Sequence, residues 1–197
     1  ANNVLTPDFL ETDIILTTAA GVHPIQISEH VFAMMLMFAR RMHEYRAAQL
    51  ESRWTKEPVS RMDELFEKTL GIVGLGSIGR EVARKAKAFG MRVVATRRHL
   101  DQAAAPDVDE LLPREQLHQL LEVSDYVVLA VPLTKETRHL IGPRELRTMK
   151  PTAFLVNIAR GAVINEAALC DALNEGTIAG AGLDTFEAEP LPEDSPL

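Results

Sequence analysis

The stretch from Thr69 to Arg80 (TLGIVGLGSIGR) constrains the fold of this chain more than any other. It begins with the apolar, β-branched run from Leu70 to Val73, which is typical of a buried strand. Gly74, Gly76 and Gly79 follow with the spacing G-x-G-x-x-G, and a helical pattern starts at once. Such glycines allow a tight turn, close approach of a pyrophosphate to the backbone, and close packing of helix on strand. The stretch therefore predicts a dinucleotide site at the start of a helix.

Short apolar strands and helical patterns alternate along the rest of the chain. We expect strands at 13–18, 70–73, 91–96, 125–131, 154–158 and 179–185. We expect helices at 25–49, 113–122 and 165–174, a helix after Gly76, and helical segments near Lys135 and at 143–149. Because the strands are apolar on both faces, the pattern predicts one α/β domain over residues 1–197. Its expected form is a doubly wound parallel sheet of the Rossmann type with helices on both faces.

The helix expected from Ile25 to about Gln49 is apolar around much of its circumference. Such a helix is buried on more than one side, either within the core alone or in the core and a subunit interface. Its most apolar part, Val31 to Ala39, is too short to span a bilayer. No membrane partner is therefore expected.

The bulk composition excludes several classes of protein. The net charge of −7 argues against a general nucleic-acid-binding surface. A single cysteine, Cys170, excludes an internal disulfide framework and favours a reducing, cytoplasmic compartment. The scattered histidines lack metal-ligand spacing, so no metal site is expected.

In a doubly wound sheet, ligands bind at the carboxyl ends of the strands, where the strand order reverses. The candidate residues are therefore those at the carboxyl ends of the expected strands or shortly after them. They are the glycine stretch 74–79, Arg97 and Arg98, Val131 and Pro132, Ile158 to Arg160, and Asp184 with Glu189.

Arg97 and Arg98 stand where a dinucleotide fold that binds NAD usually carries Asp or Glu. A carboxylate there would repel a 2′-phosphate, whereas a guanidinium can bind it through two hydrogen bonds. We therefore predict NADP as the cofactor in preference to NAD. The alternative is that both arginines are solvated surface charges.

Several blocks of sequence, in order, carry a resemblance that covers essentially the whole chain. They are SEHVFAMMLMFARR (28–41), KTLGIVGLGSIGREVARKAKAFGMRVVA (68–95), VPLTKETRHLIG (131–142), VNIARGAVINEAAL (156–169) and AGAGLDTFEAEPLP (179–192). The chain resembles the coenzyme-binding domain of the D-isomer-specific 2-hydroxyacid dehydrogenases. The arginine pair is similar to that of the glyoxylate/hydroxypyruvate reductase branch, which implies reduction of a small 2-oxo acid with NADPH.

The resemblance implies roles for individual positions. Arg160 matches the catalytic arginine that holds the substrate carboxylate and carbonyl oxygen. Glu189 matches the carboxylate that pairs with the catalytic histidine and raises its pKa, and Asp184 matches an aspartate near the nicotinamide amide. The remaining matches are Ser77 and Ile78 at the pyrophosphate, and Val131, Pro132 and Thr137 on the adenosine side.

Two departures from the family pattern qualify the resemblance. The family's catalytic histidine lies beyond the pair Glu189-Pro190, whereas all six histidines here precede Arg160. Residues 1–12 look like the tail of a substrate domain or a linker, with 1–5 as the end of a loop. We therefore expect a coenzyme domain that binds nucleotide but lacks turnover alone. The resemblance also implies a homodimer formed through residues 25–56.

Two rival interpretations remain. Transcriptional corepressors share this family's fold and use nucleotide binding to control assembly, so a non-enzymatic regulator is the main alternative. An unrelated Rossmann dehydrogenase is the second, and the blocks around VPLT, NIARG and EPLP weigh against it.

Overall fold

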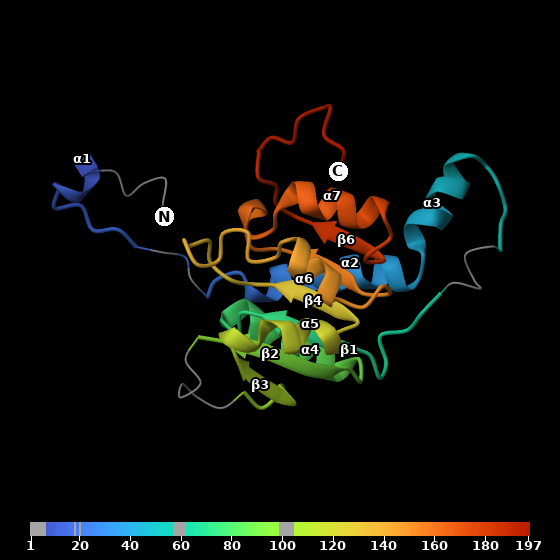
Figure 1. The fold of residues 1–197 in the computed structure, drawn as a ribbon, viewed down its shortest axis with the longest axis horizontal. Helices are drawn as coiled ribbons and strands as arrows, with labels where there is room; N and C mark the ends of the chain where they lie inside the picture. Colours follow the sequence, from blue (N-terminus) through green and yellow to red (C-terminus); the bar gives the residue numbers. More distant parts are fainter. Residues whose placement is uncertain (1–6, 18, 20, 57–61, 99–104) are drawn as a thin grey trace.

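A computed structural model describes residues 7–17, 19, 21–56, 62–98 and 105–197 (Figure 1). Six strands form one sheet in which all neighbours are parallel. They are β1 (Thr69–Val73), β2 (Arg92–Arg97), β3 (Glu110–Pro113), β4 (Tyr126–Leu129), β5 (Phe154–Asn157) and β6 (Gly180–Leu183). The order β3-β2-β1-β4-β5-β6 reverses direction between β1 and β4. The predicted doubly wound parallel sheet is confirmed.

Helices cover both faces of this sheet. One apolar cluster joins the sheet to α2 (Pro24–Ala39) and α4 (Ser77–Ala88). A second joins it to α5 (Leu117–Val123), α6 (Pro143–Thr148) and α7 (Glu166–Asn174). Side chains of β4 alternate between the clusters, with Val127 and Leu129 in the second and Val128 in the first. Burial on both faces explains why the strand sequences are apolar without interruption.

Four further elements complete the described chain. They are α1 (Pro7–Leu10), α3 (Met42–Leu50) and the 3₁₀ turns η2 (Arg114–Gln116) and η3 (Gly161–Val163). Nowhere in the described ranges does a helix have the length and apolarity needed to cross a membrane.

The strand expected at 13–18 was wrong. Residues 13–17 form no strand, and the side chains of Ile14 and Ile15 are 63% and 87% exposed. Thr18 lies outside the described residues, as do 1–5 of the expected amino-terminal tail. The run has β-branched composition, but a strand also needs a hydrogen-bonded neighbour, and residues 13–17 are not among the paired strands of the sheet.

β3 was missed, because its short sequence ELLP has only two apolar leucines between an acidic residue and a proline. It nonetheless forms the edge of the sheet beside β2, with Arg97 and Pro113 as register partners. The helix expected near Lys135 was also wrong, because residues 135–139 form turns.

The helix expected from 25 to 49 is divided in two. α2 ends at Ala39, and α3 begins after Arg41, whose φ of 53° is left-handed and interrupts the helical path. α2 is buried against α4 and β5, whereas α3 extends away from the sheet (Figure 1). Residues 42–56, here called the arm, therefore lie outside the core that α2 helps to form.

Candidate functional site

The reversal of strand order places the end of β1 beside the end of β4. Gly74, directly after β1, has a φ of +101°, and a Cβ there would lie 2.7 Å from the carbonyl oxygen of Ala130. Only glycine fits a backbone this close to the end of β4. Gly76 is the amino-terminal cap of α4, and a Cβ on it would meet nothing within 4 Å. Open space therefore lies before the first N–H groups of α4, where an anion is favoured.

A cavity of about 320 Å³ opens at this point, between the ends of β1, β2 and β4. Many of the predicted cofactor residues line it: Gly74, Gly76, Arg97, Arg98, Val131, Pro132 and Thr137. Ser77, Ile78 and Gly79 form the first turn of α4 directly after Gly76. The structure thus brings the glycine stretch, the arginine pair and the loop after β4 into one site.

Arg114 lines the same cavity, and the sequence interpretation missed it. Because Arg97 and Pro113 are register partners at the ends of β2 and β3, Arg98 and Arg114 continue from neighbouring strand ends. Arg114 Nε lies 3.5 Å from Glu115 Oε1. Had β3 been predicted, Arg114 would have been a candidate on the same reasoning as Arg98. His99 lies outside the described residues.

Glu136 is an acidic group in this basic cavity, and it too was missed. Its Oε2 accepts a 2.7 Å hydrogen bond from the Thr134 hydroxyl. The pKa of Glu136 is lowered by this bond, by its own backbone N–H, and by the positive charges of Arg98 and Arg114. The carboxylate is therefore ionised at neutral pH and offsets part of the arginine charge.

The loop after β4 is closed by Thr137. Its hydroxyl donates to the carbonyl oxygen of Pro132 at 2.6 Å and accepts from the backbone N–H of Thr134 at 2.8 Å. These bonds hold the turn that places Val131 and Pro132 on the cavity wall. Thr137 thus shapes the wall with its side chain.

A second group of predicted residues follows β5. The buried Asn157, 1% exposed, accepts a 3.0 Å hydrogen bond from the N–H of Ala159 and donates one of 3.0 Å to the carbonyl oxygen of Arg160. The sequence interpretation missed Asn157, which fixes the turn from Ile158 to Arg160. Arg160 Nη1 donates to the Ala159 carbonyl oxygen at 2.7 Å. A guanidinium has five N–H groups, so donors remain for an anionic ligand.

The third group follows β6, next to β5. The N–H of Asp184 donates to the Asn157 carbonyl oxygen at 3.0 Å, which continues the sheet for one residue. Asp184 Oδ1 lies 3.2 Å from Nε2 of His30 on α2, a contact that the sequence did not predict. Glu189 Oε1 accepts a 3.0 Å hydrogen bond from the N–H of Phe186.

The strand order sets the sequence of these groups along the edge of the sheet. The arginines lie at the ends of β2 and β3, the glycines follow β1, and Arg160 and Asp184 follow β5 and β6. Those last two lie outside the 320 Å³ cavity, on the other side of the strand-order reversal. Within the described ranges, no group of three or more His, Cys, Asp or Glu side chains could hold a metal.

Comparison with known proteins identifies a matching family. Residues 32–197 match the model for the NAD binding domain of D-isomer specific 2-hydroxyacid dehydrogenases. A glyoxylate reductase of Thermococcus gammatolerans is 43% identical over an alignment that covers 96% of this chain and 58% of that protein. A D-3-phosphoglycerate dehydrogenase of Methanocaldococcus jannaschii is 38% identical over 95% of this chain and 35% of its own length.

The fold agrees with these matches. The crystal structure of a D-isomer specific 2-hydroxyacid dehydrogenase from Xanthobacter autotrophicus Py2, in complex with NADPH and MES, superimposes with a TM-score of 0.84. It is 34% identical, and the match covers 100% of this chain and 78% of that one. The chain spans 58% of the length of the glyoxylate reductase that it matches.

Proposed function

Because the chain belongs to the D-isomer specific 2-hydroxyacid dehydrogenase family, we propose that it is the coenzyme-binding domain of a 2-oxo acid reductase. The proposed reaction reduces a small acid such as glyoxylate or hydroxypyruvate with NADPH. The observation that carries this proposal is the cavity at the strand-order reversal, lined by Arg97, Arg98 and Arg114. A glyoxylate reductase among the relatives supports the substrate class.

The residues of the site suit a dinucleotide. The open space before Gly76 accommodates a pyrophosphate against the first turn of α4, with Ser77, Ile78 and Gly79 supplying backbone. Val131, Pro132 and Thr137 would contact the adenosine in the cavity. When bound, the cofactor supplies the hydride.

The arginines favour a cofactor that carries a 2′-phosphate. β2 ends in Arg97 rather than a carboxylate, and Arg98 and Arg114 extend the positive charge on the same side of the cavity. Guanidinium groups bind phosphate through pairs of charged hydrogen bonds. We therefore propose NADP(H) as the preferred cofactor and NAD(H) as a weaker one.

The residues after β5 and β6 would act on the substrate. Arg160 would bind the carboxylate of the oxo acid and polarise its carbonyl oxygen. Glu189 would raise the pKa of the histidine that donates the proton. Asp184 would orient the nicotinamide carboxamide, beside the backbone of Ile158 and Ala159.

We further propose that residues 1–197 form one coenzyme domain of a cytoplasmic homodimer, with 1–12 leading in from the substrate domain. Residues 25–56 would form the dimer contact. The arm presents large apolar side chains, since Met42 is 55%, Leu50 70% and Trp54 90% exposed. Exposed apolar area of this kind marks an interaction surface.

Turnover by the intact protein tests the proposal. Glyoxylate, hydroxypyruvate and other 2-oxo acids would be supplied with NADPH and, separately, with NADH. We expect oxidation of the cofactor with at least one acid, and a kcat/KM about tenfold higher with NADPH. If no 2-oxo acid is reduced while nucleotide still binds, the protein is instead a nucleotide-sensing regulator.

A further inference from the structure

Arg160 and Glu189 lie on two separate loops, which follow β5 and β6. Their proposed chemistry requires a fixed distance between them, because a misplacement of about 1 Å can cost a hundredfold in rate. Four residues that carry no role in the proposed function join these loops. We call the group the clamp, and it consists of His139, Gly161, Glu166 and Glu187.

The first contact of the clamp is between backbones. A Cβ on Gly161 would lie 1.9 Å from the carbonyl carbon of Phe186 and 2.2 Å from the nitrogen of Glu187. Any larger residue would push the two loops apart. The residue directly after Arg160 thus touches the segment that leads to Glu189.

The second contact is a reciprocal pair of hydrogen bonds. Glu187 Oε1 accepts from the N–H of Glu166 at 3.2 Å, and Glu166 Oε1 accepts from the N–H of Glu187. Glu166 is the first residue of α7, so its N–H has no acceptor within the helix. A carboxylate at this helix start is also favoured by the helix dipole. Glu187 therefore attaches its loop to α7.

The third contact comes from His139, whose backbone and side chain point to different partners. Its N–H donates to the carbonyl oxygen of Ala162 at 2.8 Å, and its Nε2 lies 3.0 Å from Glu187 Oε1. His139 has a φ of 50°, a left-handed conformation that non-glycine residues adopt at a cost of order 1 kcal/mol. Its backbone is thus bonded to the loop of Arg160 while its ring contacts the loop of Glu189.

We propose that Glu187 and His139 are positioning residues, which fix the loop of Glu189 against the loop of Arg160. Glu189 belongs to the fixed segment, because its Oε1 accepts the N–H of Phe186, one residue before Glu187. Neither positioning residue contacts the reacting atoms. The catalytic consequence rests on the proposed function, whereas the attachment of the loops does not.

Four variants of the intact protein test this. Glu187→Ala removes the acceptor for Glu166 and the partner of His139, whereas Glu187→Gln keeps a side-chain acceptor. His139→Asn tolerates the left-handed backbone but is too short to reach Glu187. Glu175→Ala, an exposed residue at the other end of α7, is the matched control.

Hydrogen exchange of residues 184–189 is the first measurement, and turnover is the second. We expect Glu187→Ala and His139→Asn to raise exchange in this segment and to lower kcat about tenfold, with KM for NADPH within about twofold. Glu187→Gln should recover most of the wild-type exchange protection and most of the wild-type kcat. The control Glu175→Ala should change neither the exchange nor kcat. Unchanged exchange in Glu187→Ala overturns the proposal, whatever the activity. If the wild type reduces no 2-oxo acid but exchange still rises, the clamp stands and the proposed function fails.

Discussion

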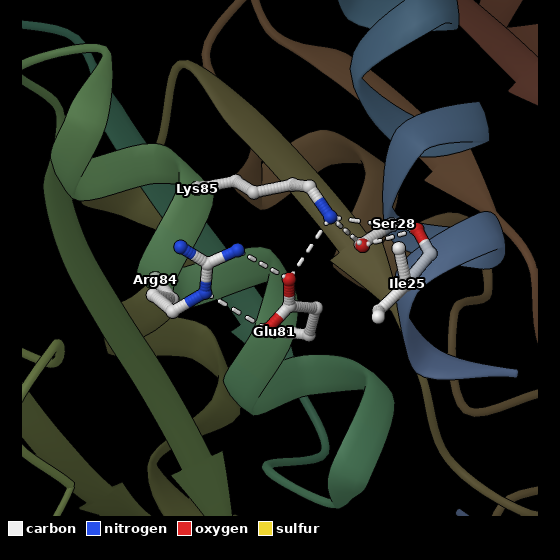
Figure 2. Close-up of polar contacts among 5 residues, drawn as sticks. All are labelled: Ile25, Ser28, Glu81, Arg84 and Lys85. Carbon is white, nitrogen blue, oxygen red and sulfur yellow. Dashed lines mark hydrogen bonds and ion pairs between the residues drawn. The ribbon is translucent and has the colours of Figure 1, made fainter. Parts of the chain in front are cut away.

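Lys85 of α4 donates a 2.7 Å hydrogen bond to the hydroxyl of Ser28, which is fully buried on α2. The same ammonium lies 3.0 Å from Glu81 Oε1, and Arg84 Nη2 donates to that same oxygen at 2.6 Å. Figure 2 shows Lys85 reaching from α4 to α2 above the Glu81 carboxylate. The cluster therefore fixes α4, whose first turn forms the proposed pyrophosphate site, against its neighbouring helix.

Glu81→Gln should lower the stability of the fold in a pH-dependent way. In the wild type, hydrogen bonds from Arg84 and Lys85 lower the pKa of Glu81 from 4.5 to about 2. A carboxyl whose pKa is lowered on folding stabilises the fold above its unfolded pKa and loses this effect as the pH falls through the folded pKa. We expect a lower Tm than wild type at pH 7, and a difference that shrinks between pH 4.5 and about 2.

Thermal unfolding of both proteins across this pH range, followed by circular dichroism, gives the difference. Glu122→Gln is the control, since Glu122 is an exposed glutamate on α5. A Tm difference between Glu81→Gln and wild type that stays constant from pH 7 to pH 2 would contradict a stabilising role of the ionised Glu81 carboxylate.

Gly79→Ala should destabilise the turn on which the site is built. A Cβ on Gly79 would lie 2.3 Å from the carbonyl oxygen of Gly74 and 3.2 Å from Cγ2 of Ile72. Because backbone must move to admit the methyl group, we expect a loss of about 1–3 kcal/mol in the free energy of unfolding by urea. A loss below about 0.5 kcal/mol would show that helix and strand can separate without cost.

Gly76→Ala is the matched counterpart of Gly79→Ala. It should leave the stability of the fold nearly unchanged and weaken nucleotide binding. Nothing lies within 4 Å of a Cβ there, so the free energy of unfolding should change by less than about 0.5 kcal/mol. The methyl group would instead occupy the space proposed for a pyrophosphate. We expect calorimetry to show weaker binding of NADPH. An unchanged affinity would mean that the pyrophosphate does not bind at Gly76.

Arg114→Gln should weaken binding of a ligand with a 2′-phosphate. Arg114 lies at the end of β3 on the cavity wall, beside the arginines that end β2. Loss of one charged hydrogen bond should lower affinity for 2′,5′-ADP about tenfold and leave 5′-AMP unchanged. Calorimetry with the two nucleotides measures this, with Arg147→Gln on α6, outside the cavity, as control. Equal losses for both ligands would contradict a role at the 2′-phosphate.

Glu136→Gln should act in the opposite direction. The carboxylate offsets the charge of Arg98 and Arg114, so its removal should strengthen binding of 2′,5′-ADP by about two- to fivefold. The gain should shrink at high salt, because the interaction is between solvent-exposed charges. Weaker binding would instead mean that Glu136 contacts the ligand as an acceptor.

Arg160→Ala should lower kcat/KM for the oxo acid in the intact protein by about 100- to 1,000-fold. Arg160→Lys should recover only part of this, because an ammonium cannot donate two parallel hydrogen bonds to a carboxylate. Steady-state kinetics with saturating NADPH gives both values. Kinetics equal to wild type in Arg160→Ala would remove Arg160 from the mechanism.

The prediction from the sequence was best for segments whose backbone conformation is determined by local chemistry alone. The turn from Gly74 to Gly79 needs residues without a Cβ at Gly74 and Gly79, and their spacing is visible in the sequence. Arg114 was missed because β3 is short and owes its place to pairing with β2. Conversely, Ile14 and Ile15 have strand composition, but they are not part of the sheet.

The polar contacts that organise the site could not be predicted from the sequence for a different reason. The pair of His30 with Asp184 and the bonds of Asn157 join residues through the folded topology. Neither arises from a local pattern. The family resemblance supplied Arg160 and Glu189, but it did not supply the contacts that hold them.

The exposure of the arm gives this protein a built-in optical probe. Trp54 is the only tryptophan in the chain and is 90% exposed. Its emission therefore reports the arm alone, free of contributions from the sheet and the nucleotide cavity. If a second copy covers the arm, the emission maximum shifts to the blue as concentration rises. Association through the arm can thus be followed by this emission, and cofactor binding by calorimetry.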